Sequence, residues 1–273
     1  MSEVTLTQST RVNLLALQKN TALIDRTSLR LSTGKRVNAP AENVRAFVLA
    51  KALTDQAGDL LSVKGPIGQS LSAVGGALDG IDTITRLVEQ LKATASGATD
   101  RTAAERAEQA ASFDRLRAQL DGIAADINYG GVNLLAASPD SLTVTFDNTS
   151  GSSLTIEGVA SDSQALGIGD GAVTFNNFAT DADIQAAIDA LDAAITTLRQ
   201  TASGLGSNAS VLNTRLDFTQ ALAHTFETGA AKLVGIDLNG EAANLLSLNI
   251  ARQLSIASLN IANQSQQAIL QLF

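Results

Sequence analysis

The sequence contains no cysteine and no tryptophan, and it has a single histidine, three prolines and only 3% aromatic residues. The absence of cysteine excludes disulfides, thiolate metal sites and cysteine nucleophiles, but it does not indicate a cellular compartment. At 273 residues, of which 45% are hydrophobic, the chain has enough apolar material for a substantial core. Because small and aliphatic residues take the place of aromatics, the composition favours long, closely packed helices.

Positive charge is also scarce. The formal net charge is -8, the sequence pI is about 4.6, and lysine and arginine form no cluster along the chain. Nucleic acids and anionic membrane surfaces are bound by clustered basic residues. The sequence therefore predicts no nucleic-acid partner.

Charge of either sign is scarcest in the last 31 residues, Ala243–Phe273, where Arg252 is the one charged side chain. Asn, Gln or Ser recurs there every two or three positions, which argues against a membrane-spanning helix, so no membrane insertion is expected. The opening MSEVTLTQSTRVNLLALQK lacks a basic region followed by an apolar stretch and a small-residue cleavage site. We expect no cleaved secretory signal peptide, and any export must then use another route.

Heptad spacing is the strongest positive signal. Reading by alternate steps of three and four from residue 46 to residue 95 gives 15 positions, of which 13 are apolar. This spacing predicts a coiled-coil seam on a long helix. Pro66 lies within it, and because its ring displaces a helical hydrogen bond, we expect a kink or interruption near residues 62–68.

Two further helical runs follow. The shorter begins at Phe113 and is preceded by a capping box, with Thr102 as the cap and Glu105 three residues later. The longer runs from Ile184 to Leu233 at heptad spacing, broken only by Thr219. A helix of about 50 residues is about 75 Å long, so a rod-like molecule is expected.

Residues 138–180 have a different composition. Leu142, Val144 and Phe146 alternate with polar residues, as do Leu154 and Ile156 after a polar turn, which predicts a β-hairpin. The Gly- and Asp-rich segment after it is interpreted as loop with a short strand. The predicted fold class is mainly α: a long-helix coiled-coil rod with a terminal helix pair and a small β-hairpin insert. The predicted domains are 1–33 with 238–273 (terminal helical core), 34–137 with 181–237 (rod), and 138–180 (insert).

Catalytic chemistry is not expected. His224 has no second histidine or cysteine with which to form a metal site, and GIGDG at Gly167–Gly171 lacks the strand and helix of a phosphate-binding loop. The segment from Asp147 to Glu157 lacks the carboxylates that a calcium loop needs at its third and fifth ligand positions. We therefore predict no catalytic, cofactor or metal site and no enzymatic activity.

Four segments resemble bacterial flagellins. They are RLSTGKRVNAPAENVRAFVLAKALTDQ (30–56), GALDGIDTITRLVEQL (76–91), INYGGVNLLA (127–136) and DLNGEAANLLSLNIARQLSIASLNIANQSQQAILQLF (237–273). The resemblance covers residues 1–136 and 181–273 in the order that the family has. The sequence departs from the family pattern at Asn38–Phe47 and at Pro66.

The resemblance implies a structural subunit that polymerises into the bacterial flagellar filament for motility, of a minimal type with a small outer insert. It implies export through the flagellar type III apparatus and an extracellular location in the filament. The implied partners are other copies of the chain, the export apparatus, an export chaperone, and filament cap and junction proteins. An alternative within the same machine is a hook-filament junction protein, which shares both terminal patterns. A soluble signalling coiled coil is less consistent with the charge-poor ends. A helical enzyme is less consistent with the lack of a convergent acid, base, nucleophile or metal set.

The resemblance also suggests functional positions. Glu89 lies where flagellins recognised by the Toll-like flagellin receptor have arginine, which predicts weak recognition because the charge is reversed. Hydroxyl residues of the insert are candidate O-glycosylation sites: Thr149, Ser150, Ser152 and Ser153. The residues predicted to pack between subunits in the inner core are Leu14, Leu17, Ile24, Leu31, Leu245, Ile250, Leu254, Ile261 and Ile269.

Overall fold

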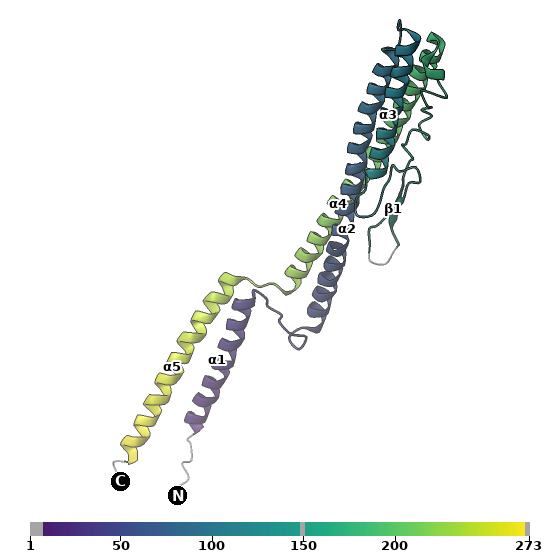
Figure 1. Cartoon of the computed structure of the whole chain (residues 1–273). Helices are drawn as coiled ribbons and strands as arrows, with labels where there is room; N and C mark the ends of the chain where they lie inside the picture. The colour runs from purple at the N-terminus through teal and green to yellow at the C-terminus, as the bar shows by residue number, and fades with distance from the viewer. Residues whose placement is uncertain (1–7, 148–150, 271–273) are drawn as a thin grey trace. The chain divides into compact units, whose positions relative to one another are not determined.

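The protein is mainly α-helical, with one small β-hairpin (Figure 1). The computed structural model describes residues 8–147 and 151–270. Its elements are α1 (Gln8–Thr33), α2 (Val44–Ser96), α3 (Ala103–Asp126), β1 (Ser141–Thr145), β2 (Ser153–Glu157), the 3-10 turn η1 (Asn176–Phe178), α4 (Asp181–Val234) and α5 (Leu238–Leu270). The predicted fold class, with long helices, paired terminal helices and a hairpin, is confirmed.

The chain divides into two compact units, which are described separately. Unit 1 comprises Met1–Gln56 and Thr225–Phe273, and unit 2 comprises Ala57–His224. The long helices α2 and α4 therefore contribute residues to both units. The three-part division expected from the sequence stays a prediction, although α1 ends at Thr33 and α5 begins at Leu238, where two of its boundaries were placed.

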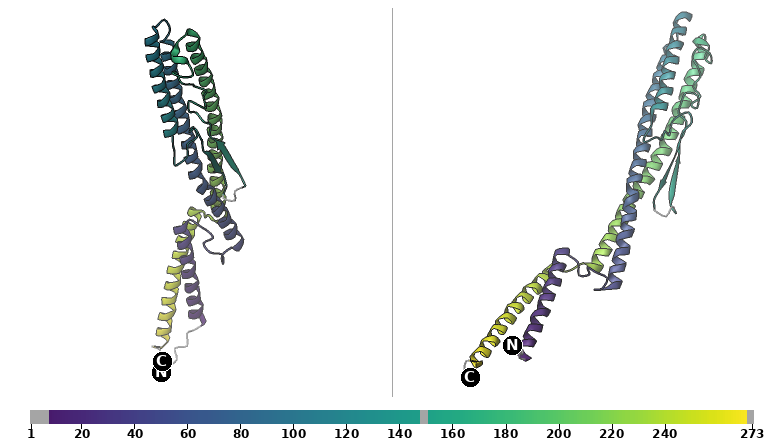
Figure 2. Two further views of the ribbon diagram at one scale, coloured as in Figure 1. Left: turned by 45° about the vertical axis from the view of Figure 1, so that its right-hand side comes forward. Right: turned by 60° about the horizontal axis from the view of Figure 1, so that its bottom comes forward.

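In unit 1, α1 and α5 lie side by side and run in opposite directions (Figures 1 and 2). Gly34 adopts a left-handed conformation (φ 67°) that ends α1. The two connecting segments then pair: the backbone N–H of Arg36 donates to the carbonyl of Val234 at 2.6 Å, and Lys35 forms a β-bridge with Gly235. A small apolar cluster lies beside these two connecting segments. Its buried members are Val37, Ala50, Ala230 and Val234, and the partly buried residues Ala46, Phe47, Leu53 and Leu233 pack against them.

Unit 2 is built on α3 and the unit-2 portions of α2 and α4, which pack side by side (Figure 2). The predicted heptad positions of α2 are all buried from Val63 to Ala95, whereas Leu49 and Gln56, which belong to unit 1, are exposed. The capping box at the start of α3 is present, because Thr102 and Glu105 exchange hydrogen bonds. Heptad residues of α4, among them Leu191, Leu198, Leu205 and Leu212, join the same core.

Pro66 does not interrupt α2, so the expected interruption is wrong, while the expected kink stays a prediction. The helix runs from Val44 to Ser96 with Pro66 inside it. Proline removes one backbone hydrogen bond, but Pro66 is exposed, so water can satisfy the freed carbonyl of the preceding turn. Val63 and Ile67 are buried on either side of Pro66 and hold the helix against the core.

The predicted β-hairpin forms, and its strands pair with Leu142 opposite Ile156 and Val144 opposite Leu154. Val144, Ile156 and Phe146 are buried against the helices. The short strand expected in the following segment is wrong: residues 158–180 form loop and the 3-10 turn η1. Their backbone groups bond to side chains of α3 instead of to a strand, as described below. Across residues 8–147 and 151–270, no helix is sufficiently long and apolar to traverse a membrane.

Candidate assembly surfaces

The contact between α1 and α5, called here the terminal seam, is formed by residues that alternate by three and four on both helices. All are buried or half-buried: Thr10, Asn13, Leu17, Asn20, Ile24, Thr27 and Leu31 on α1, and Glu241, Leu245, Leu248, Arg252, Ser255, Leu259 and Ala262 on α5. This spacing is that of a coiled coil. Half of the seam is nevertheless polar, and Thr10 and Thr27 are each only 4% exposed.

Large apolar side chains in contact with solvent lie along the edges of the seam and on the sides of α1 and α5 that face away from it. These outward rows comprise Val12, Leu14, Leu15 and Leu29 on α1, and Leu238, Leu246, Ile250, Leu254, Ile256 and Ile261 on α5, with exposures from 38% to 67%. Leu246, Ile250 and Leu254 follow one another at four-residue steps and therefore share a face of α5. Contiguous apolar surface of this kind marks a protein interaction site.

The structure divides the predicted inner-core residues between these two faces. Leu17, Ile24, Leu31 and Leu245 lie on the terminal seam, within one chain. The exposed residues Leu14, Ile250, Leu254 and Ile261 lie on the outward rows. The side chain of Ile269 falls outside the described residues. Sequence reasoning missed the other members of the outward rows: Val12, Leu15, Leu29, Leu238, Leu246 and Ile256.

The seam contains charged groups near the ends of α1 and α5 that face the linkers. Arg30 lies 3.7 Å from Glu42 and 3.9 Å from Glu241. The backbone N–H of Asn38 donates to the carboxylate of Glu42 at 2.6 Å, which lowers the pKa of Glu42 below its usual value. At mid-seam, Arg252 is half-buried and makes no ion pair with any residue in 8–147 or 151–270. The guanidinium of Arg252 can therefore pair with a group of another molecule or be solvated by water.

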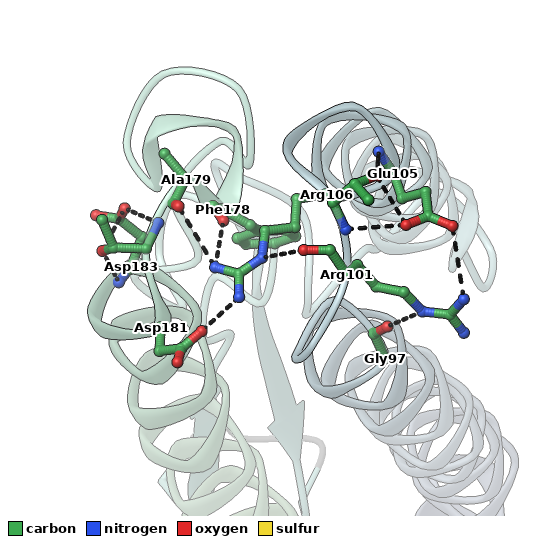
Figure 3. Close-up of polar contacts among 10 residues, drawn as sticks. Gly97, Arg101, Glu105, Arg106, Phe178, Ala179, Asp181 and Asp183 are labelled. Atoms are coloured by element: carbon green, nitrogen blue, oxygen red, sulfur yellow. Dashed lines mark hydrogen bonds and ion pairs between the residues drawn. The ribbon is translucent and has the colours of Figure 1, made fainter.

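At the ends of α3 and α4 in unit 2, Arg106 joins three segments (Figure 3). Its Nη2 lies 2.6 Å from Asp181, and its Nη1 donates to the carbonyls of Phe178 at 3.2 Å and Ala179 at 3.4 Å. Phe178 has a left-handed backbone (φ 55°), as do Asn176 and Asn177. This conformation is unfavourable for an L-residue with a bulky side chain. Complete burial of Phe178 against Phe113 and Phe175 and the bonds from Arg106 offset its cost.

The loop that follows the hairpin is held along α3 by carboxylates. Asp114 accepts hydrogen bonds from the backbone N–H groups of Gly171 and Ala172, and Asp121 accepts from the backbone and hydroxyl of Ser163. Arg117 pairs with Asp170 and donates to the hydroxyl of Ser163. These groups are all engaged in holding the loop. They therefore fulfil a structural role.

The other singled-out residues lie apart from one another. His224 is exposed on α4, Glu89 is exposed on α2, and Ser153 is exposed on β2 while Ser152 is half-buried beside it. Thr149 and Ser150 lie outside the described residues. Within the described ranges, no three histidines or carboxylates come close enough together to hold a metal ion.

Comparison with known proteins points to one family at both ends of the chain. Residues 4–140 match the bacterial flagellin N-terminal helical region, and residues 188–273 match the bacterial flagellin C-terminal helical region. Flagellin FljM of Caulobacter vibrioides is 32% identical over 95% of this chain and 95% of its own length. A flagellin of Brucella melitensis is 25% identical over 100% of this chain and 99% of its own. A crystal structure of Bacillus cereus flagellin has a TM-score of 0.47 and 18% identity, covering 55% of this chain and 86% of that one.

Proposed function

The chain belongs to the bacterial flagellin family and is a structural subunit of the bacterial flagellar filament; from this premise, we propose that it polymerises by covering the outward rows of α1 and α5 with neighbouring copies. The observation that carries the proposal is the row Leu246, Ile250 and Leu254, which is 64%, 49% and 65% exposed on one face of α5. A soluble chain rarely leaves such a row uncovered.

The outward rows are suited to a lattice because they flank a helix pair whose own contact is already made. Each copy can offer one row to a neighbour and receive another neighbour on a different face. Contacts of this heterologous, non-closing kind generate helical filaments instead of closed rings. Burial of apolar surface contributes about 25 cal/mol per Å². We therefore assign most of the assembly energy of the terminal helices to these rows.

We further propose that residues 8–31 and 240–270 become fully ordered only on assembly. The half-polar seam buries little apolar surface in a single chain, so the helix pair alone is weakly stabilised. A terminus that orders late suits passage through the flagellar export apparatus without a cleaved signal peptide. An export chaperone that covers α5 before assembly, and cap and junction proteins that contact the growing end, complete the proposed partners.

The alternative of a hook-filament junction protein gains no support from the comparisons, since the relatives reported above are named flagellins. The family is a structural one, and we propose that this member has no enzymatic activity. This proposal agrees with the engagement of the unit 2 carboxylates in holding backbone groups.

Glu89 is proposed as the position that weakens recognition by the Toll-like flagellin receptor. It is exposed on α2, so a receptor can reach it. A carboxylate facing a surface that accommodates arginine is repelled and costs affinity. Glu89→Arg is expected to raise potency in a receptor reporter assay, with Glu108→Arg, on exposed α3 surface, as the matched control. Full potency of the unaltered protein contradicts the assignment.

Ser152 and Ser153, with Thr149 and Ser150, are proposed as sites that can carry O-linked sugars. Ser153 is exposed on β2 and Ser152 is half-buried next to it. The intact mass of protein from native filaments tests this directly. A mass equal to that of the unmodified chain rejects the proposal.

Electron microscopy of the purified chain tests the function itself. The protein is expected to form long filaments under polymerising conditions, whereas a junction protein forms a short layer at most. Failure of the intact, folded chain to form filaments when seeded with filament fragments contradicts polymerisation as proposed.

A further inference from the structure

Among the residues that the structure describes, α1 and α5 are joined by a polar contact near each end of the terminal seam. The side-chain amide of Asn13 donates to the hydroxyl of Ser258 at 3.2 Å, and Arg30 lies 3.9 Å from the carboxylate of Glu241. We call this pair of contacts the register links. They connect residues that are more than 200 positions apart in the sequence.

The register links have the same spacing on both helices. Arg30 follows Asn13 by 17 residues, and Ser258 follows Glu241 by 17 residues. Because α1 and α5 run in opposite directions, one alignment of the two helices satisfies both contacts together. The seam residues Thr10 and Thr27 are also 17 residues apart, so the links follow the three-and-four spacing, but no charged pair recurs one heptad from Arg30 and Glu241.

The rest of the seam does not distinguish this alignment from its neighbours. Its residues recur by three and four on both helices, so a shift of one heptad brings another set of the same kind face to face. The large apolar residues of the seam, among them Leu17, Ile24 and Leu248, also recur at heptad positions, so they resist such a shift little. Register must therefore come from contacts that do not repeat.

A shift of one heptad breaks the register links unequally. In one direction, Arg30 meets Leu248 in place of Glu241, which sets a cation against an apolar group. In the other direction, Arg30 passes the beginning of α5 at Leu238 and loses Glu241 as a partner, although it keeps Glu42. Asn13 meets Ser265 or Ala251 in the two cases, so its contact is less discriminating than that of Arg30.

We propose that the register links Asn13–Ser258 and Arg30–Glu241 select the single alignment in which α1 pairs with α5, so that the outward rows of every copy have the same geometry. The inference rests on the proposed function, because identical outward rows matter only for a subunit that builds a lattice. It concerns register and not chain identity, since an α5 from another copy satisfies the links equally.

The absence of cysteine from the chain allows a direct test by disulfide cross-linking. Thr27, buried in the seam, is replaced by cysteine as the anchor. Asn244→Cys then reports the native alignment, and Ala251→Cys reports the alignment shifted by one heptad. None of these three positions belongs to a register link. Each pair is placed in the full chain, in the unaltered background and in the background Asn13→Leu with Arg30→Leu.

In the unaltered background, the native reporter is expected to cross-link and the shifted reporter is not. In the leucine background, the shifted cross-link is expected to rise by about fivefold, because the Arg30–Glu241 ion pair contributes a modest preference, whereas Asn13 can meet Ser265 in the shifted alignment. Gln18→Leu with Arg26→Leu, on exposed positions of α1, adds the same residues and removes the same charge without touching a link. This control background is expected to keep the native pattern.

Cross-linking in the leucine background through the native reporter alone would overturn the inference, as would a shift of equal size in the control. Electron microscopy of the same samples distinguishes a failure of the proposed function from a failure of the register assignment. If the unaltered chain forms no filaments, the proposed function fails; if it forms filaments and the cross-links do not shift, only the register assignment fails.

Discussion

Asn13 on α1 and Ser258 on α5 form a hydrogen bond of 3.2 Å between two helices that bury polar groups and expose leucines. Thr27 is 4% exposed on this seam, while Leu15 and Leu254 are 67% and 65% exposed on the other faces of the same helices. A helix pair that is stable within a single chain buries its leucines in the contact between the two helices. The arrangement is explained if neighbouring copies, and not the single chain, supply the apolar contacts of α1 and α5.

Polar substitution on an outward row is expected to weaken assembly without unfolding the chain. Leu254→Gln removes about 1–2 kcal/mol of apolar burial at a neighbour contact, which raises the critical concentration for polymerisation about tenfold. Sedimentation of filaments at several protein concentrations measures this value. Val173→Gln, on a loop residue of unit 2 that is 80% exposed, serves as the control and should leave it unchanged. An equal rise of the critical concentration in Leu254→Gln and Val173→Gln would contradict the assignment of the outward rows to subunit contacts.

Arg252→Leu is expected to alter assembly more than Arg101→Leu. Arg252 is half-buried in the terminal seam, whereas Arg101 lies in an exposed turn of unit 2. A half-buried cation that has no ion-pair partner in its own chain is stabilised most when the lattice places a carboxylate or water beside it. Filament yield and morphology by electron microscopy compare the two variants. Normal filaments from Arg252→Leu would show that its charge has no role.

Arg106→Met is expected to lower the free energy of unfolding of unit 2 by about 1–3 kcal/mol, because it leaves the carbonyls of Phe178 and Ala179 without their donor. Asp181 is 74% exposed, so its ion pair with Arg106 contributes the smaller share. Thermal unfolding followed by circular dichroism measures the loss. Arg101→Met, a change at a more exposed arginine of the same region, should shift stability by less than about 0.5 kcal/mol.

Acid should destabilise the helix starts. The backbone N–H of Thr102 donates to Glu105, and the hydroxyl of Thr180 donates to Asp183; these bonds lower the pKa of both carboxyl groups. A lowered pKa in the folded state means that the stabilisation is present above the ordinary values of 4.5 and 3.8 and is lost as pH falls below them.

Glu105→Gln with Asp183→Asn should therefore flatten the fall of the melting temperature between about pH 5 and pH 3. Glu89→Gln, which changes a carboxylate without a capping role, is the control and should leave the slope as it is. An unchanged slope in the double variant would show that the caps do not set the acid sensitivity.

The sequence predicted those features that depend on local pattern. The heptads of α2 from Val63 to Ala95, the capping box of Thr102 and the β-hairpin that contains Leu142 all follow from spacing and residue type. Apolarity alone could not assign the faces of α1 and α5, because their leucines occur on two sides and the seam is marked by Asn and Thr at heptad positions. Such a polar heptad, read from Thr10 to Leu31, is the signal that would have located it.

Tertiary contacts decided the remaining features. Pro66 remains helical because the buried residues on either side of it hold α2 in place, which no local rule describes. The left-handed turn at Asn176–Phe178 depends on Phe113 and Arg106, which lie on α3, about 70 residues earlier in the chain. The short strand expected in the segment after the hairpin was wrong for the same reason, since Asp114 and Asp121 of α3 supply partners for the backbone of this segment.

Amide hydrogen exchange on the monomer and on the assembled filament tests the central claim most directly. If neighbouring copies cover the outward rows and complete the order of the terminal helices, residues 8–31 and 240–270 should exchange far more slowly in the filament than in the monomer. Residues 63–95 of α2, already packed in unit 2, should change little. Equal protection of the terminal helices in both states would contradict assembly through α1 and α5.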